Sequence, residues 1–170
     1  MTVLDCDEFA SPIGRVVFAS NSDGVCALGF DGYEKRWTPF LERRFGPFEF
    51  RRGSDPYKLK VRLRKYFDGD MSAFDSVRIS LGGSPFQQRV WTELLAIPAG
   101  ETRTYGQLAQ KMGKPEASRA VGHANALNPV SLIVPCHRVI GTTSLTGYGG
   151  GLERKAWLLR HEGAQLRLTL

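Results

Sequence analysis

The sequence "GGSP" at residues 82–85 constrains the fold of this chain more than any other feature. Two consecutive glycines interrupt regular structure, while Ser84 and Pro85 are residue types that cap and open a helix. Before this break the hydrophobic residues follow strand-like patterns, and after it they favour short helices separated by glycines. The sequence therefore predicts two domains, residues 1–83 and residues 84–170.

The first predicted domain combines strands with helices. Two β-rich runs flank an Asn-Ser-Asp-Gly turn, which is typical of a β-hairpin. Two stretches with an apolar helical face follow, and the second begins at an Asp-Pro pair that suits a helix start. The predicted strands are residues 14–20, 25–30 and 74–81, and the predicted helices are residues 34–45 and 55–70. This domain is therefore expected to be α/β.

The second predicted domain contains a pair of short helices. A helix over residues 86–97 is followed by two shorter ones, residues 105–112 and 116–127, joined by a Gly-Lys-Pro turn. Two short helices with a glycine-containing turn between them are typical of a helix-turn-helix DNA-binding unit. Many helical pairs share this spacing, so the pattern favours DNA binding without requiring it.

Mostly small residues make up the second helix of this pair. A helix that reads the major groove normally presents several Arg, Asn or Gln side chains to base edges. Small residues permit close approach, either to a minor groove or to the rest of the domain, and the pattern leaves both open. A buried Arg119 would need a partner, which favours the first alternative. The candidates for exposure are Ala117, Ser118, Arg119, Ala120, Gly122, His123, Ala124, Asn125 and Ala126.

The net charge of +6 is concentrated in the second half of the chain. Residues 1–83 carry 13 Lys and Arg against 12 Asp and Glu, whereas residues 84–170 carry 10 against 5. A basic domain suits a polyanionic partner such as nucleic acid.

The composition also indicates where the protein works. No run of about 18 apolar residues occurs, so neither a transmembrane helix nor a membrane partner is expected. The N-terminal stretch is acidic and contains Pro12 and Gly14, unlike a secretion signal. Three cysteines without a CxxC spacing are typical of a reduced, cytoplasmic protein rather than a disulfide scaffold.

Residues 133–141, "IVPCHRVIG", place a thiol, an imidazole and a guanidinium side by side in an apolar run. A thiol becomes a useful nucleophile only as a thiolate, which an adjacent base can promote. Adjacent side chains of a strand point to opposite faces, so Cys136 and His137 can meet only if the backbone turns, which Pro135 permits. Glu162 could then orient the imidazole.

Two other interpretations of this dipeptide stay open. A Cys-His pair often serves packing alone, without catalysis. A zinc site is less favoured, because no second Cys or His pair lies at ligand spacing.

Six motifs occur in order along nearly the whole chain: "SPIG" at residues 11–14, "FQQRVW" at 86–91, "IPAGETRTYGQLA" at 97–109, "SRAVGHA" at 118–124, "NPVSLIVPCHRVIG" at 128–141 and "GYGGG" at 147–151. This ordered set resembles the O6-alkylguanine-DNA alkyltransferase family. The resemblance implies an α/β N-terminal domain of ribonuclease-H-like topology and a mainly α C-terminal domain with a winged helix-turn-helix. It also implies repair of O6-alkylguanine, and of O4-alkylthymine, in duplex DNA by irreversible transfer of the alkyl group to the protein.

The same resemblance implies catalytic roles for five residues. Cys136 would accept the alkyl group, His137 would act as a base through a water, and Glu162 would orient the imidazole. Tyr105 would donate a proton or hydrogen bond to N3 of the departing guanine. Asn128 would hold the turn beside the segment that carries the thiol.

Contacts with DNA are implied in the same way. The target atom lies inside the duplex, so the base must be flipped out of the stack. Arg119 would fill the gap that the nucleotide leaves, and the small residues around it would line the minor groove. The residues implied at the groove are Ser118, Ala120, Gly122 and Ala124, and those around the flipped base are Val134, Pro135, Tyr148, Gly149 and Gly150.

No cofactor and no metal ion are expected. Some members of the family carry zinc in the N-terminal domain, but the first histidine here is His123, which leaves Cys6 and Cys26 without a histidine partner. Gly149 replaces a hydroxyl residue found in other members, so one donor near O6 is expected to be missing. The protein is expected to be a monomer, with cooperative assembly on DNA left open. The alternative functions are a non-catalytic alkyltransferase-like damage sensor and a Cys-His hydrolase.

Overall fold

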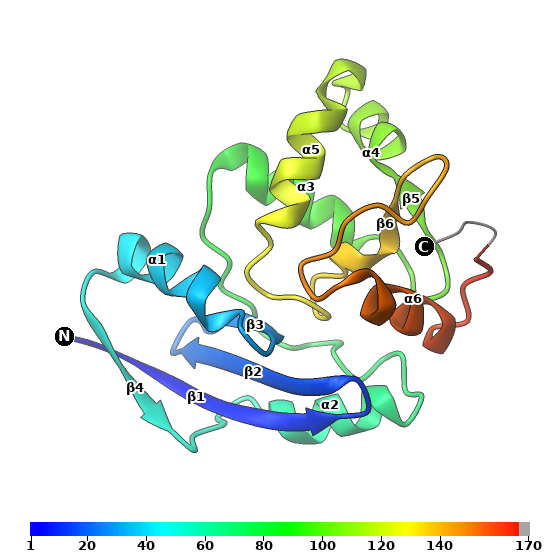
Figure 1. Cartoon of the computed structure of the whole chain (residues 1–170). Helices are drawn as coiled ribbons and strands as arrows, with labels where there is room; N and C mark the ends of the chain where they lie inside the picture. The colour runs from blue at the N-terminus through cyan, green and yellow to red at the C-terminus, as the bar shows by residue number, and fades with distance from the viewer. Residues whose placement is uncertain (167–170) are drawn as a thin grey trace. The chain divides into compact units, whose positions relative to one another are not determined.

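The structure is a computed structural model that describes residues 1–166. The chain divides into two compact units, Met1–Gly82 and a unit that begins at Gly83. The first is a sheet with two helices, and the second is largely helical (Figure 1). The prediction of an α/β first part followed by a mainly helical second part is confirmed.

A four-stranded sheet with the order β3-β2-β1-β4 forms the first unit. β1, β2 and β3 pair antiparallel in sequence order, and β4 joins the free edge of β1 in parallel. Every residue of β3 is buried, so this strand lies in the core of the unit. The predicted hairpin is confirmed by β2 and β3. The strands are β1 (Thr2–Ser11), β2 (Gly14–Asn21), β3 (Gly24–Phe30) and β4 (Phe48–Arg52).

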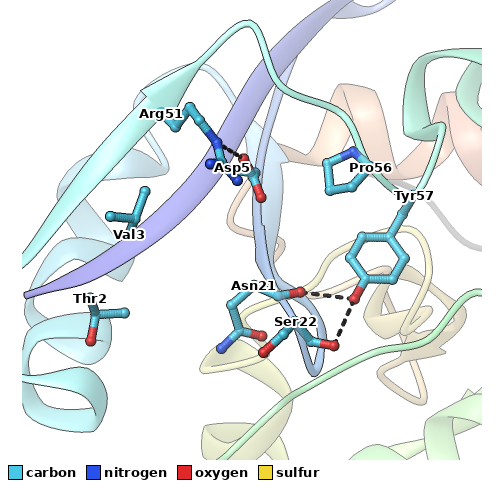
Figure 2. Close-up of a pocket in the computed structure, with 8 residues that line it drawn as sticks. All are labelled: Thr2, Val3, Asp5, Asn21, Ser22, Arg51, Pro56 and Tyr57. Carbon is cyan, nitrogen blue, oxygen red and sulfur yellow. Dashed lines mark hydrogen bonds and ion pairs between the residues drawn. The ribbon is translucent and has the colours of Figure 1, made fainter.

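β1 and β4 were not indicated by the sequence. Two acidic residues of β1 point to the same face, and a carboxylate at a buried or half-buried position needs a partner that the local sequence does not reveal. Asp5 pairs with Arg51 of β4 (Figure 2), and Asp7 lies 2.7 Å from the ammonium of Lys60. Cations from later in the chain therefore make an acidic strand possible.

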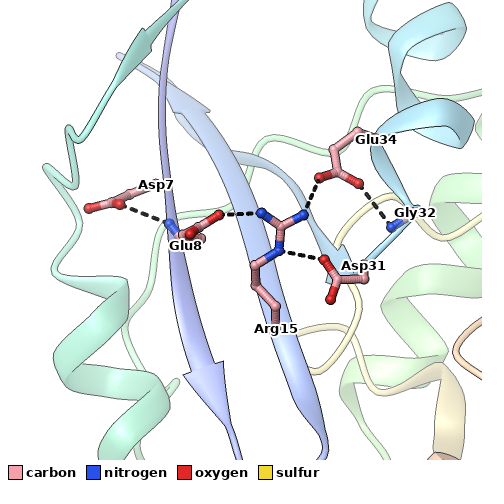
Figure 3. Close-up of polar contacts among 6 residues, drawn as sticks. All are labelled: Asp7, Glu8, Arg15, Asp31, Gly32 and Glu34. Atoms are coloured by element: carbon pink, nitrogen blue, oxygen red, sulfur yellow. Dashed lines mark hydrogen bonds and ion pairs between the residues drawn. The ribbon is translucent and has the colours of Figure 1, made fainter.

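α1 (Glu34–Phe45) spans the range predicted for the first helix. Its first residue belongs to a cluster of charges around Arg15 of β2 (Figure 3). The Arg15 guanidinium lies 2.6 Å from Glu8 of β1, 3.6 Å from the carboxylate of Glu34, and also bonds Asp31. The cluster links two strands to the start of the helix at the surface of the unit.

α2 (Leu59–Phe67) is shorter than the predicted helix of residues 55–70. The carboxylate of Asp55 accepts the N–H groups of the first two helical residues, at 2.7 and 2.9 Å. Lys58 has a left-handed φ of +56°, which prevents the helix from extending towards Asp55. The segment before the helix is tied to the hairpin turn, because the Tyr57 hydroxyl donates to the Asn21 carbonyl at 2.8 Å (Figure 2).

The predicted strand over residues 74–81 is wrong. Its only pairing is an isolated bridge, in which Val25 donates to the Arg78 carbonyl and accepts from the Ser80 N–H, both at 2.9 Å. Ser76 has a φ of +66°, so the chain turns where a strand would continue. The apolar residues here pack as a loop over the edge of the sheet.

All the helices predicted for the second unit are present, although the last helix of the expected pair is divided. A 3-10 turn, η1 (Pro115–Ala117), precedes α5 where one continuous helix was predicted. Among residues 1–166, no helix is long and apolar enough to cross a membrane. The α-helices of this unit are α3 (Pro85–Leu95), α4 (Tyr105–Lys111), α5 (Ser118–Ala126) and α6 (Leu152–His161).

α3 begins as predicted, with Ser84 as the cap and Pro85 as the first helical residue. The Ser84 hydroxyl accepts the N–H of Gln87 at 3.2 Å, and the Gln87 side chain accepts the N–H of Ser84 at 2.9 Å. Further along α3, the indole N–H of Trp91 donates to the Ala124 carbonyl of α5 at 2.9 Å. This buried bond joins the two helices.

Two short strands bring distant parts of the second unit together. β5 (Arg103–Thr104) and β6 (Val139–Ile140) pair in parallel. β5 leads directly into α4, which begins with Tyr105, while β6 directly follows the 3-10 turn η2 (Cys136–Arg138). The pairing therefore places the start of α4 beside the segment that carries the thiol.

Candidate active site

Two consecutive three-residue turns bend the chain before Cys136. The first has Leu132 at its centre with a φ of +68°, and the N–H of the next residue donates to the carbonyl of the preceding one at 2.8 Å. The second has Pro135 at its centre and the same type of bond, also at 2.8 Å. A left-handed leucine is strained, and such strain persists where the surroundings enforce it. The apolar run is therefore not a strand, and the expected turn at Pro135 is present.

Two asparagines hold the bent segment. Asn128 Nδ2 donates to the Val134 carbonyl at 2.8 Å, and Asn128 Oδ1 accepts the N–H of Val130 at 3.0 Å. Asn125 Nδ2 donates to the carbonyl of Cys136 at 3.4 Å. Because Asn125 lies in α5 and Asn128 just after it, these bonds attach the thiol segment to that helix.

The Cys136 residue is only 6% exposed. Burial raises the pKa of its thiol above the ordinary value, while the polar side chains of Asn128 and Ser131 and the charge of Lys155 oppose that shift. The thiol is therefore mostly protonated at neutral pH. A base must remove its proton before the sulfur can act as a nucleophile.

Glu162 is held by the two residues that follow the thiol. Its Oε1 lies 2.8 Å from His137 Nε2, and Arg138 donates to both carboxylate oxygens, at 2.8 and 2.9 Å. Burial opposes ionisation of Glu162, but the bonds from His137 and Arg138 outweigh it and hold the pKa of the carboxyl well below its usual range. The carboxylate is therefore ionised.

His137 is fully buried, and burial lowers its pKa although Glu162 partly offsets that shift. A neutral imidazole carries one N–H, and the ionised carboxylate at Nε2 requires the proton on that nitrogen. Nδ1 then keeps its lone pair, and this buried atom has no hydrogen-bond partner among residues 1–166. The arrangement leaves Nδ1 of His137 able to accept a proton.

Tyr105 lies where α4, α5 and the loop after β6 meet. Its ring lies against Gly122 of α5, where an added Cβ atom would make an ordinary van der Waals contact with the ring at 3.5 Å. Its hydroxyl is 2.9 Å from Thr146 Oγ1 in the loop. The phenol is thus fixed at both ends by segments far apart in the sequence.

The residues expected around a flipped base lie in two different environments. The Tyr148 ring stands edge-on to the His137 ring, with centroids 6.4 Å apart. Gly149 is exposed, whereas Val134 and Pro135 are buried. Gly150 is half-buried in the loop that leads to α6.

The surface of α5 agrees with the sequence expectation except towards its end. Ala124 is 2% exposed and its carbonyl accepts from Trp91, so the expectation that it faces outward is wrong. Asn125 is buried as well, because it bonds the thiol segment. The implied groove residues that do reach the surface, fully or in part, are Ser118, Arg119, Ala120 and Gly122.

Two charged residues of the site were not assigned a role from the sequence. Arg138 holds Glu162 and also donates to the Ile97 carbonyl at 2.6 Å. The Lys155 side chain is buried in α6, and burial lowers its pKa to about 8. A lysine at helical spacing within an apolar face is a signal that could have revealed it. Its apolar neighbours at this spacing are Leu152, Ala156 and Leu159.

The other two cysteines lie in the first unit and are free. Burial raises the pKa of Cys6, and it raises the pKa of Cys26 to about 12. Within residues 1–166, no three His, Cys, Asp or Glu side chains are grouped as ligands for a metal ion. Neither thiol is followed in the sequence by a histidine, as Cys136 is.

The chain is similar to known proteins along most of its length. Residues 85–164 match the family model described as 6-O-methylguanine DNA methyltransferase, DNA binding domain. A methylated-DNA–protein-cysteine methyltransferase of Shigella flexneri is 42% identical over 161 residues, which cover 92% of this chain and 94% of the relative. The protein of the same name from Methanosarcina acetivorans is 44% identical over 160 residues, 92% of this chain and 96% of the relative.

Solved structures share the fold. The crystal structure of Mycobacterium tuberculosis O6-methylguanine methyltransferase matches with a TM-score of 0.79 and 42% identity, covering 94% of this chain and 93% of that one. The OGT protein of the same organism in complex with DNA matches with a TM-score of 0.79 and 41% identity, covering 94% and 92%. The chain belongs to the methylated-DNA–protein-cysteine methyltransferase family.

Proposed function

We propose that this chain repairs O6-alkylguanine in duplex DNA by transferring the alkyl group to Cys136. The observation that carries the proposal is a buried thiol directly before an imidazole that can accept a proton at Nδ1. A thioether has no easy hydrolysis route, so each molecule would react once. O4-alkylthymine presents a similar alkyl–oxygen bond and is the proposed second substrate.

The proposed reaction begins with loss of the thiol proton. His137 Nδ1 accepts this proton through a bridging water, and the Glu162 carboxylate stabilises the resulting imidazolium at Nε2. The thiolate of Cys136 attacks the alkyl carbon, so a C–S bond forms as the C–O6 bond breaks and the electron pair moves onto guanine. Tyr105 donates a proton or hydrogen bond to N3 of that guanine. In the overall balance, the thiol loses one proton and the guanine gains one.

Base flipping follows from the burial of Cys136. A thiol that is 6% exposed cannot reach an atom inside the base stack, so the nucleotide must leave the duplex. Exposed Arg119, in the first turn of α5, is the proposed filler of the gap. Ser118, Ala120 and Gly122 would lie along the minor groove, where small residues permit close approach.

The flipped base would occupy a pocket beside the thiol. Tyr148 is the proposed aromatic wall, because its ring already borders His137. Gly149 and Gly150 would admit the base from the loop side, while Val134 and Pro135 would contribute backbone atoms. Asn128 keeps the backbone of this segment in place through its bond to Val134.

The two units are proposed to have different tasks and different topologies. The unit that begins at Gly83 would bind DNA and perform the transfer as a winged helix-turn-helix, supported by α4, η1, α5 and the β5–β6 pair. A ribonuclease-H-like topology for Met1–Gly82 is supported by three antiparallel strands followed by a helix and a parallel strand. A monomer in the cytoplasm is proposed, since three free cysteines suit a reducing compartment.

Intact mass spectrometry tests the function. After mixing with a duplex that contains O6-methylguanine, the protein should gain the mass of one methylene (a methyl group in place of the thiol hydrogen), and peptide mapping should place it on Cys136. Cys136→Ser should bind the duplex without gaining mass, because a serine hydroxyl is far less ionised than a thiol. Cys26→Ser is the matched control and should react like the wild type. Binding without mass gain by the wild type would instead identify a damage sensor, and multiple turnover would identify a hydrolase.

A further inference from the structure

The hydroxyl of Tyr105 is already engaged within the protein. It lies 2.9 Å from Thr146 Oγ1, and Thr146 Oγ1 is also 2.6 Å from the Leu145 carbonyl. A carbonyl can only accept, so the single hydroxyl proton of Thr146 goes to Leu145. In the bond between the two hydroxyls, Tyr105 must therefore be the donor and Thr146 the acceptor.

Thr146 holds this position at a conformational cost. Its φ is +59°, a left-handed conformation that is unfavourable for a β-branched residue. Gly141 makes room for it, because a Cβ atom there would lie 2.4 Å from Thr146 Cγ2. Strained residues of this kind cluster where their geometry serves a function.

Lys155 fixes the carbonyl groups on both sides of Thr146. Its buried ammonium donates to Leu145 at 2.7 Å and to Gly147 at 3.3 Å, and it also bonds the Val139 carbonyl of β6. The Leu145 carbonyl thus accepts from the lysine and from Thr146 at once. A chain of hydrogen bonds runs from Tyr105 through Thr146 to a carbonyl that a cation holds.

We propose that Thr146 is the positioning residue that sets the direction of the Tyr105 hydroxyl, accepting a hydrogen bond from it in the empty site and donating one to its oxygen when a base is bound. The inference rests on the proposed function, in which Tyr105 turns its proton towards the departing guanine. Reversal needs only rotation of the Thr146 and Tyr105 hydroxyl groups and breaks no covalent bond. The Leu145 carbonyl keeps its bond from Lys155 throughout, so no buried acceptor loses every partner.

The reversal also strengthens the donor. When Tyr105 donates to the base, negative charge develops on its phenol oxygen, and a hydrogen bond from Thr146 stabilises that charge. Without the Thr146 hydroxyl, the ring would stay packed against Gly122 but its oxygen would have no donor from the loop.

Four variants test this role in single-turnover transfer from O6-methylguanine duplex. Thr146→Val keeps the branched shape without the hydroxyl and should slow transfer about tenfold, the usual worth of one well-placed hydrogen bond. Thr146→Ser should restore the rate to within about twofold of the wild type, since it keeps the hydroxyl. Thr143→Val makes the same chemical change at an exposed position of the same loop and should leave the rate unchanged. Thr146→Gly removes the hydroxyl but relieves the backbone, so it should be as slow as Thr146→Val even if the valine variant folds poorly.

A double-mutant cycle with Tyr105→Phe separates positioning from packing. Once the phenol hydroxyl is gone, Thr146→Val should change the rate by less than about twofold. Equal losses in the presence and absence of the phenol, or a Thr146→Gly variant as fast as the wild type, would overturn the inference. These results differ from failure of the proposed function, in which the wild type itself gains no methyl group. Affinity for undamaged duplex should be the same in all variants, because Thr146 acts after binding.

Discussion

Both units of the molecule pair charged side chains, but the cluster around Arg15 in the first unit and the network around Glu162 in the second lie at different depths. In the first unit the Arg15 side chain is 45% exposed, and those of Glu8 and Asp31 are 55% and 47% exposed. In the second unit the Glu162 side chain is fully buried, and its partner Arg138 is 12% exposed. Water can replace a lost partner in the first set but not in the second.

The difference shows what each set contributes. Exposed pairs add little to stability, since water competes with them and salt screens them. Buried ions are costly to place, so a network such as Glu162 with His137 and Arg138 holds one arrangement in which every charge is satisfied. In this protein that arrangement determines which nitrogen of the imidazole carries the proton.

Removal of the proposed base should have the largest effect on transfer. His137→Ala should slow single-turnover transfer by about 10²–10⁴-fold at neutral pH, the usual contribution of a general base. His161→Ala is the control, because that ring stacks on Trp157. A rate close to the wild type would reduce His137 to a packing role.

The pH dependence makes the same test more specific. In the wild type the transfer rate should stay level between the lowered pKa of His137, below 6.5, and the raised pKa of Cys136, above 9.0. Without the base only preformed thiolate can react, so the rate of His137→Ala should rise about tenfold per pH unit towards the thiol pKa. A level profile in this variant would contradict the proposed proton transfer.

The next largest effect is expected for Glu162→Gln, which should lower the free energy of unfolding. An amide leaves the buried Arg138 without its counter-ion, so the free energy of unfolding at pH 7 should fall by about 3–5 kcal/mol. Because the folded-state pKa of Glu162 is depressed, its contribution is complete above the unfolded pKa of about 4.3 and is lost as the pH falls below that value. Urea denaturation should therefore show a difference from the wild type that shrinks on acidification, and a growing difference would refute the ionised carboxylate.

Arg119→Ala should affect one substrate far more than another. A residue that fills the gap of a flipped nucleotide matters only when a base leaves the stack, which costs a few kcal/mol. Single-turnover transfer from duplex should slow about tenfold or more, while the reaction with free O6-benzylguanine changes by less than about twofold. Equal losses on both, together with a lower melting temperature, would assign Arg119 to the fold instead.

The smallest effect is expected in the exposed set. Arg15→Gln removes the centre of the cluster shown in Figure 3, yet water can solvate each remaining carboxylate. Its melting temperature and its transfer rate should both stay close to those of the wild type. A large loss of stability would show that the cluster organises the sheet. The exposed cluster and the buried network around Glu162 would then not differ in their contribution to stability.

Local patterns predicted the elements that depend on neighbours in the chain. The hairpin of β2 and β3 follows from two β-rich runs around a turn, and the start of α3 follows from Ser84 and Pro85. The acidic strand β1 could not be found in this way, because Asp5 and Asp7 acquire their partners from distant segments. The same reason explains the wrong strand at residues 74–81, where no second strand pairs along its length.

The sequence by itself determined the helices, the break before Ser84 and the adjacent thiol and imidazole, because these depend on residue type and short spacing. Only the tertiary structure decided that Leu132 would be strained, that Glu162 would accept a hydrogen bond from Nε2 of His137, and that Tyr105 would meet Thr146. The last two need segments far apart in the chain to come together. Burial and the hydrogen-bond partners that tertiary contacts supply together set the direction of a pKa shift, and no local pattern encodes them.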